Sequence, residues 1–339
     1  MLRHASSEVA VFVSPYGAAL LKRCVHIVLD GTFAYAPQGV VQIYRVFGII
    51  GGEANPFALA LMTGKHQSNY DIVFENVRGA LDQTVGALKI KFAHFDCERA
   101  AINAFSVHFP EVAPKMCNFH IKSNINRKIQ NLGLGNAYNS NSKIENIVRQ
   151  LGALNLLPIN LVESAFQKLF EALPSSDIDN DFPPGVCNSL RDLFAYYQNQ
   201  WVRNSLGLNF VNIFDIGDGP RTTNHAESYH SSQRHYFRAP NMLLGEWLCA
   251  FQEKHHAEET RIRDIMQNRI EPRARHPTAI ENDRKLNDAR EALEFCLEIN
   301  SNDSEAYWEG IVKYLTRAGA ILGYSSSAHL NLSEDNSSV

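Results

Sequence analysis

Three acidic residues, far apart in the chain, stand where a carboxylate can take part in chemistry. Asp30 and Asp96 each follow a short apolar run typical of a buried strand, and Glu227 falls in the first turn of a predicted helix. Hard divalent cations such as Mg²⁺ prefer carboxylate oxygens as ligands. Two such ions roughly 4 Å apart can clamp the attacking and leaving oxygens of a phosphoryl displacement. The first hypothesis is therefore a site for two Mg²⁺ (or Mn²⁺) ions held by these three acids.

Each acid also has a purely structural interpretation. Asp30-Gly31 is a common turn pair. Asp96 stands between a predicted strand and a predicted helix, where Asp often caps the helix N-terminus. Glu227 lies three residues after Asn224, which is the spacing of a capping box. The residue types alone leave both interpretations open.

The elements around the acids predict a mixed sheet. The predicted strands are Val9–Ser14, His26–Leu29, Val40–Ile50, Phe57–Met62, Ile90–Phe95 and Val112–Cys117. From residue 26 on, the order is strand, strand, strand, helix, strand, helix, strand. A three-strand meander followed by crossover units gives an α/β fold with helices on the sheet faces, as in an RNase H-like core. In that sheet the strands of Asp30 and Asp96 can be neighbours, with Asp96 at a strand end where such sheets place ligands.

The chain after the sheet is predicted to be helical. Apolar residues keep a helical period from residue 121 to about 218 without a convincing strand, so we expect an all-helical insertion there. A later helix would then return Glu227 to the sheet. The expected parts are a first catalytic-core part over 9–120, the insertion over 121–218, returning core helices over 219–270, and a helical C-terminal part over 271–339. Ser325–Val339 is rich in Ser and Asn, and we expect disorder there.

Composition limits the class of protein. The chain has 339 residues, 45% apolar and 20% charged, which suits a globular protein with a sizeable core. The net charge of −4 gives no overall basic footprint, so any nucleic acid must bind local basic patches or a partner. Six cysteines without a CxxC pair indicate neither a zinc ribbon nor a disulfide framework. We expect no membrane span and no signal peptide.

Many linked positions together resemble the transposase of Mutator-like elements, the MULE domain of the DDE superfamily. The likeness runs from about Val9 to about Glu258. The residues that carry it are Asp30-Gly31-Thr32-Phe33, Pro37, Gln42-Ile43-Tyr44, Pro56–Leu61, Gly64-Lys65, Tyr70, Asp96–Ile102, Phe109-Pro110, Cys117-Asn118-Phe119-His120, Asn124, Arg127–Gln130, Gly133-Leu134 and Arg221–Ser228.

The resemblance implies that Asp30, Asp96 and Glu227 are the DDE triad and that the helical insertion is the one typical of this group. It implies metal-dependent hydrolysis at element ends and strand transfer into target DNA, in the nucleus, and we expect a homodimer. Family members usually carry a DNA-binding module before this domain, whereas this chain starts almost at its first strand. We therefore expect a fragment, a truncated gene copy, or a protein that finds DNA through a partner.

Further residues are candidates for auxiliary roles. Cys117 and His120 match the family's C-x2-H element, which supplies at most half a zinc site, so we expect no bound zinc. A buried Cys and a core His is the alternative interpretation. Candidate contacts to DNA phosphates are Lys122, Arg127, Lys128, Arg221, Arg234 and Arg238.

Two other functions compete with the transposase. A domesticated or relic transposase could act as a DNA-binding or regulatory scaffold without catalysis; the three retained acids count against it, and the missing module counts for it. A nuclease of the same sheet architecture is a third hypothesis, which the insertion before Glu227 disfavours.

Overall fold

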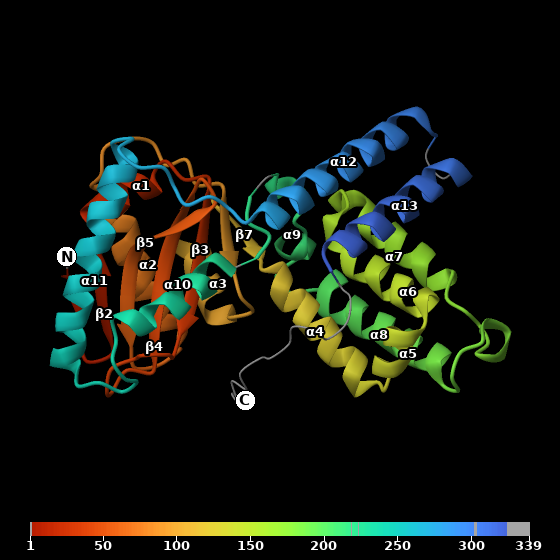
Figure 1. The fold of residues 1–339 in the computed structure, drawn as a ribbon, viewed down its shortest axis with the longest axis horizontal. Coiled ribbons are helices and arrows are strands. Elements are labelled where there is room, and N and C mark those ends of the chain that lie inside the picture. Colours follow the sequence, from red (N-terminus) through yellow and green to blue (C-terminus); the bar gives the residue numbers. More distant parts are fainter. Residues whose placement is uncertain (1, 218, 223, 302–303, 324–339) are drawn as a thin grey trace. The chain divides into compact units, whose positions relative to one another are not determined.

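The computed structural model describes residues 2–217, 219–222, 224–301 and 304–323; within these, the side chains of residues 224, 225, 227 and 228 are not described. The chain divides into two compact units (Figure 1). The sheet unit takes in Met1–Ile121 and Asn209–Ala279, and the helical unit takes in Lys122–Leu208 and Ile280–Val339. No helix in the described part of the chain is both long and apolar enough to cross a membrane.

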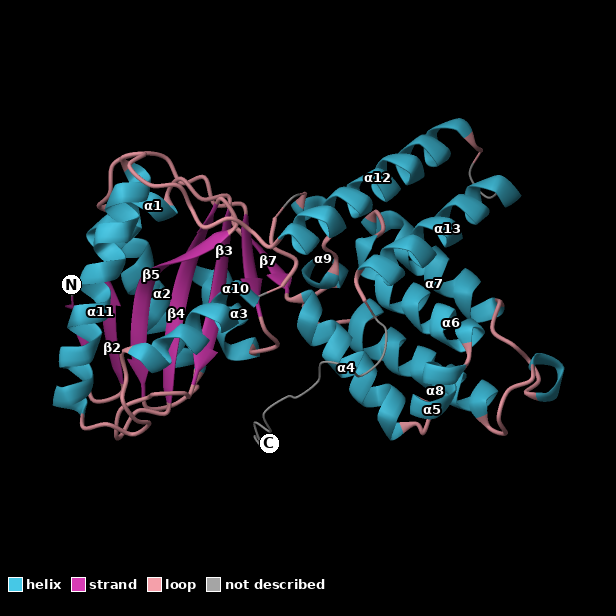
Figure 2. Cartoon of the chain, in the orientation of Figure 1, coloured by secondary structure: helices cyan, strands magenta, loops and turns pink. Residues whose placement is uncertain are grey.

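The sheet unit is built on one mixed sheet of seven strands, in the order β1-β2-β5-β4-β3-β6-β7 (Figure 2). The strands are β1 (Leu2–Ala5), β2 (Val9–Val13), β3 (His26–Thr32), β4 (Gln42–Ile50), β5 (Glu53–Met62), β6 (Phe92–Phe95) and β7 (Ala113–Met116). β3, β4 and β5 pair antiparallel, whereas β6 is parallel to β3 and β7 is parallel to β6. The predicted meander and crossover strands are confirmed. β1 was not predicted.

The tight turn between β4 and β5 follows from two glycines. Gly51 and Gly52 both adopt positive φ angles, 58° and 80°. A two-residue hairpin turn with positive φ at both positions matches the right-handed twist of the strands, and glycine reaches it without strain. β4 is the middle strand of the meander, and its residues from Gln42 to Gly48 are buried. Its long apolar run therefore reflects coverage on both faces.

Helices cover both faces of the sheet (Figure 2). The helices of this unit are α1 (Pro15–Leu21), α2 (Gln67–Asp82), α3 (Arg99–His108), α9 (Leu208–Val211), α10 (Asn224–Ser232) and α11 (Leu244–Met266). On one face, Phe74 of α2 and Phe105 of α3 pack edge-to-face with ring centroids 5.3 Å apart, and Phe105 also contacts Phe95 of β6. On the other face, Trp247 and Phe251 of α11 join Leu59 and Leu61 of β5 in a buried cluster.

The helical unit contains helices from two distant stretches of the chain. They are α4 (Asn118–Asn131), whose first residues lie in the sheet unit, α5 (Gly135–Ser140), α6 (Ser142–Ala153), α7 (Val162–Glu171), α8 (Val186–Tyr197), α12 (Pro277–Ile299) and α13 (Glu305–Ile321). α13 packs closely on α6. A Cβ at Gly319 of α13 would lie only 2.5 Å from the carbonyl oxygen of Arg149, so only glycine allows this approach. Tyr314 of α13 also donates a hydrogen bond to the carbonyl oxygen of Leu156 at 2.8 Å.

This grouping differs in two respects from the predicted parts, which ended the helical insertion at 218 and treated 271–339 as a segment of its own. The first stretch of the helical unit ends at Leu208. α13 belongs with the helices of 122–208 in the structure. The predicted disorder of Ser325–Val339 concerns residues that lie outside the described part of the chain.

Candidate active site

Asp30 and Asp96 occupy neighbouring strands. β3 and β6 are parallel, and Val28 pairs with His94. Continuing this register by two residues places Asp96 level with Asp30. Because strand side chains alternate between faces, Asp30 points to the same face as Val28. That face is the one covered by α10, since Val28 packs against Ala226 of α10.

Asp30 lies within β3 and not at its end. The strand continues to Thr32, so the predicted end at Leu29 is wrong. Asp30 and Gly31 both pair with β4, and Arg45 lies opposite Asp30. The turn interpretation of Asp30-Gly31 is therefore also wrong. A Cβ at Gly31 would lie only 1.7 Å from Nε2 of Gln42, so a larger residue here would displace the Gln42 side chain.

Asp96 begins the connection between β6 and α3. Its Oδ1 accepts a hydrogen bond from the backbone N–H of Glu98 at 3.0 Å. The N-cap residue of α3 is Glu98, so the interpretation of Asp96 as the N-cap is wrong. Burial, the charge of Glu98 and the charge of Asp30 raise the pKa of Asp96 to about 6, against the smaller opposing effects of the hydrogen bond and of His120. The folded chain thus gathers negative charge around Asp96, and a cation would relieve the repulsion.

Glu98 is a third carboxylate close to this pair, and sequence reasoning missed it. One of its oxygens, Oε1, lies 3.5 Å from Nζ of Lys65, and the other lies 3.5 Å from Nε2 of Gln42. Gln42 is buried and its Oε1 accepts a hydrogen bond from the hydroxyl of Tyr70 at 3.2 Å. Burial and the charges of Glu98 and Asp96 raise the pKa of Tyr70 above its ordinary value. The sequence signal that could have identified Glu98 is its position two residues after Asp96.

His230 is a second residue that sequence reasoning missed. Its Nε2 lies 3.1 Å from Oδ2 of Asp30. His230 lies in α10, and it reaches Asp30 because Ala226, one turn earlier in the helix, packs on Val28 and Phe47 of the sheet. No sequence pattern connects positions 30 and 230, because the two residues are brought together only by the return of the chain to the sheet.

Two contacts hold that returning segment in place. Lys115 of β7 is fully buried, and its ammonium group donates to the carbonyl oxygens of Asn209 and Asn212, each at 3.0 Å, and pairs with Asp215 at 2.8 Å. The backbone N–H of Asn118 donates to the carbonyl oxygen of Arg221 at 2.8 Å, three residues before α10 begins.

Glu227 lies in α10, three residues before His230. Its side chain lies outside the described part of the structure, so the third member of the predicted triad stays a prediction. Among the side chains that the structure describes, no group of three or more His, Cys, Asp or Glu residues is placed to hold a metal ion.

Cys117 and His120 lie where β7 ends and α4 begins, close to the two aspartates. The backbone N–H of Cys117 donates to the carbonyl oxygen of Phe95, the residue before Asp96, at 2.8 Å. Burial alone would lower the pKa of His120, but the contact with Cys117 and the charges of Asp96 and Asp30 raise it to about 9. The imidazole of His120 is therefore expected to carry positive charge beside the acids at neutral pH.

The six basic candidates are divided between the units. Arg221, Arg234 and Arg238 belong to the sheet unit, and the last two are exposed. Lys122, Arg127 and Lys128 belong to the helical unit. Within that unit, Nζ of Lys122 donates to the carbonyl oxygen of Leu322 at 3.3 Å, and Nζ of Lys128 lies 5.5 Å from the ring centroid of Tyr196. Their role in DNA binding stays a prediction.

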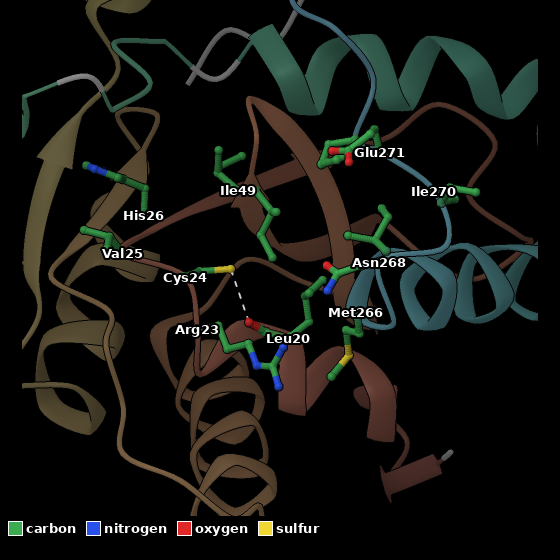
Figure 3. Close-up of a pocket in the computed structure, with 13 residues that line it drawn as sticks. Leu20, Arg23, Cys24, Val25, His26, Ile49, Met266, Asn268, Ile270 and Glu271 are labelled. Atoms are coloured by element: carbon green, nitrogen blue, oxygen red, sulfur yellow. Dashed lines mark hydrogen bonds between the residues drawn. The ribbon is translucent and has the colours of Figure 1, made fainter.

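A pocket of about 540 Å³ lies at the start of β3, and neither Asp30 nor Asp96 lines it (Figure 3). Its walls come from the end of α1, the β4–β5 hairpin and the segment after α11, and Ile49, Ile265 and Pro272 contribute to its apolar lining. Sγ of Cys24 donates to the carbonyl oxygen of Leu20 at 3.4 Å, and burial raises its pKa to about 12. The thiol is therefore protonated at neutral pH and is no nucleophile.

Comparison with known proteins identifies one family. Residues 26–124 match the model of the MULE transposase domain. No curated protein matches the chain. The matched stretch contains Asp30, Asp96, Cys117 and His120, and the family resemblance seen in the sequence is confirmed over it. Glu227 lies beyond the matched residues.

Proposed function

We propose, from the premise that residues 26–124 are a MULE transposase domain, that this chain is the catalytic part of a Mutator-like DDE transposase. The proposed reaction begins with attack of water on a phosphodiester at the element end, which leaves a 3′-hydroxyl and a 5′-phosphate. The 3′-hydroxyl then attacks a phosphodiester of target DNA, forming a new bond and releasing another 3′-hydroxyl. Asp30, Asp96 and Glu227 would form the catalytic triad.

The sheet order supports an RNase H-like core for this chemistry. Three antiparallel strands, β5, β4 and β3, are followed across the sheet by β6 and β7, which run parallel to β3. This is the meander and crossover arrangement that the sequence analysis expected of such a core. β1 and β2 extend the sheet beyond β5.

The observation that carries the proposal is the pair of carboxylates on neighbouring parallel strands. Asp30 and Asp96 are close enough for the charge of Asp30 to raise the pKa of Asp96. The donors that the two side chains offer are carboxylate oxygens, which are the ligands that Mg²⁺ and Mn²⁺ prefer, and a divalent cation would offset the repulsion between their negative charges. Asp30, Asp96 and Glu227 would hold the ions, which would supply charge neutralisation at the scissile phosphate.

The chain's own residues orient the acids. The backbone N–H of Glu98 holds Oδ1 of Asp96, and His230 lies against one oxygen of Asp30. Buried Gln42 lies 3.5 Å from a carboxylate oxygen of Glu98 and accepts a hydrogen bond from buried Tyr70, which fixes the side chains beside Glu98. Fixed acids of this kind contribute to catalysis by positioning the phosphate for in-line attack.

Glu227 would join the pair from α10. Residues three apart in a helix lie on the same side of it, so the position of His230 beside Asp30 supports a position of Glu227 near the site. We further propose that the protein acts in the nucleus, where it would contact element ends and target DNA.

A nicking assay tests the proposal. Supercoiled plasmid is incubated with the full chain in Mg²⁺, in Mn²⁺ or in EDTA, and nicked circles are quantified. We expect nicking that depends on the metal and is lost in Asp30→Asn and Asp96→Asn. Asp82→Asn is the matched control, because Asp82 forms only a surface pair with Arg78 on α2.

Nicking that survives in Asp96→Asn would contradict the assignment. A wild-type chain that binds DNA, but neither nicks it nor gains thermal stability from Mg²⁺, would favour the non-catalytic scaffold instead.

A further inference from the structure

His230 of α10 contacts Asp30 of β3 across the buried interface between that helix and the sheet. Its Nε2 lies 3.1 Å from Oδ2 of Asp30, and only 9% of the residue is exposed to solvent. The ring packs edge-to-face against Phe47 of β4, with centroids 5.9 Å apart. The imidazole is therefore held between the sheet and α10 with little room to turn.

The other ring nitrogen faces an amide. Nε2 of the fully buried Gln233 lies 2.9 Å from Nδ1 of His230. With the amide nitrogen in this orientation Nδ1 accepts, and a neutral imidazole then carries its proton on Nε2; the reverse orientation of the amide would place the proton on Nδ1. Nε2 of His230 lies 3.1 Å from Oδ2 of Asp30, but its N–H is not aligned well enough for a hydrogen bond. The contact between His230 and Asp30 is therefore a close polar contact, whereas Gln233 and His230 are within hydrogen-bond distance.

We propose that His230 is a positioning residue, whose protonated Nε2 faces Oδ2 of Asp30 and leaves Oδ1 of that carboxylate to bind a divalent cation. Gln233 would fix the required tautomer. The proposal rests on the proposed function, because it assigns the contact to the cation site of the transposase. Hydrogen-bonded groups behind a metal ligand orient it and commonly change metal affinity by about 10- to 100-fold.

Metal binding gives the first test. Mn²⁺ affinity is measured by electron paramagnetic resonance of the free ion, with the full chain and without DNA. We expect His230→Phe, which keeps an aromatic ring against Phe47, to weaken Mn²⁺ binding about 10- to 100-fold. His230→Gln keeps an N–H donor at the position of Nε2, and we expect it to restore affinity to within about threefold of wild type.

The matched control is His108→Phe. Nε2 of His108 also lies near an aspartate oxygen, 3.5 Å from Oδ1 of Asp71, but this pair joins α3 to α2 and does not contact Asp30 or Asp96. We expect unchanged Mn²⁺ affinity in this variant. Equal affinity in wild type and His230→Phe, or an equal loss in His108→Phe, would overturn the proposal.

A spectrum of the metal-free protein separates this proposal from the proposed function. Long-range ¹H–¹⁵N correlation in EDTA should show His230 protonated at Nε2 and not at Nδ1. Gln233→Leu removes the donor to Nδ1, and we expect part of the population to shift to the other tautomer. A proton on Nδ1 in wild type would overturn the positioning role even if Mn²⁺ binds. If the spectrum is as expected but wild type binds no Mn²⁺, the proposed function fails and the contact is structural.

Discussion

Replacing Asp96 by Asn should make the metal-free protein more stable and at the same time remove its response to metal. The two side chains have nearly the same shape, and the Asn oxygen can still accept the hydrogen bond from the N–H of Glu98. What changes is the charge. In the wild type the carboxylate is ionised at neutral pH against burial and against the charges of Glu98 and Asp30.

The size of the effect follows from the pKa of Asp96, which rises from 3.8 to about 6 on folding. One pKa unit corresponds to about 1.4 kcal/mol, so ionised Asp96 destabilises the fold by about 3 kcal/mol above pH 6. Because the folded state binds the proton more tightly, this penalty is absent below pH 3.8 and grows as pH rises through 6. Burial of the Asn amide offsets part of the gain, which leaves about 2–3 kcal/mol.

Urea unfolding in EDTA at pH 8 and at pH 4 measures the difference. We expect Asp96→Asn to be more stable than wild type at pH 8 and nearly equal to it at pH 4. Asp82→Asn is the control, and it should lie within about 0.5 kcal/mol of wild type because its ion pair is exposed. Mg²⁺ should raise the melting temperature of wild type and leave that of Asp96→Asn unchanged. A variant that is less stable than wild type at pH 8 in EDTA would refute the reasoning.

Three further changes test the surroundings of the site. Lys115→Met should lower the free energy of unfolding by about 3 kcal/mol, because it leaves buried acceptors without a donor. Urea unfolding measures this loss, and a loss below about 1 kcal/mol would contradict the prediction. Burial raises the pKa of Glu53, but hydrogen bonds from the Arg261 side chain and from the Arg273 N–H outweigh it and hold the pKa below 4.5. Glu53→Gln should therefore lower the free energy of unfolding by about 1–2 kcal/mol at pH 7, and this difference should shrink as pH falls below 4.5. Urea unfolding at several pH values measures it, and a difference that stays constant in acid would refute the reasoning. Cys117→Ala should lower the pKa of His120 from about 9, because it removes the contact that raises it most; an unchanged NMR titration would show that the thiol has no such effect.

Much of the sheet could be predicted from local patterns. Runs of apolar residues identified β3, β4, β5, β6 and β7, and the helices between them fixed which strands had to be parallel. Crossover rules then made β3 and β6 candidates for neighbours, which predicted that Asp30 and Asp96 lie close together. The match of the two aspartates in register follows from this pairing.

The residues that the sequence did not reveal depend on contacts between distant segments. His230 meets Asp30 because the chain returns to β7 at residues 209–215, and that return is held by Lys115, a lysine whose burial no local pattern indicates. Similarly, the predicted helical character of the C-terminal part over 271–339 gives no indication of what α13 packs against. Contacts such as the close approach of Gly319 to Arg149 and the hydrogen bond from Tyr314 to Leu156 show that α13 completes the helical unit.

Anomalous diffraction from crystals of the full chain soaked in Mn²⁺ tests the central claim most directly. We predict a manganese peak within bonding distance of carboxylate oxygens from both Asp30 and Asp96, with Glu227 completing the site. A manganese ion bound elsewhere in the chain, with these two aspartates unliganded at saturating Mn²⁺, would contradict the account.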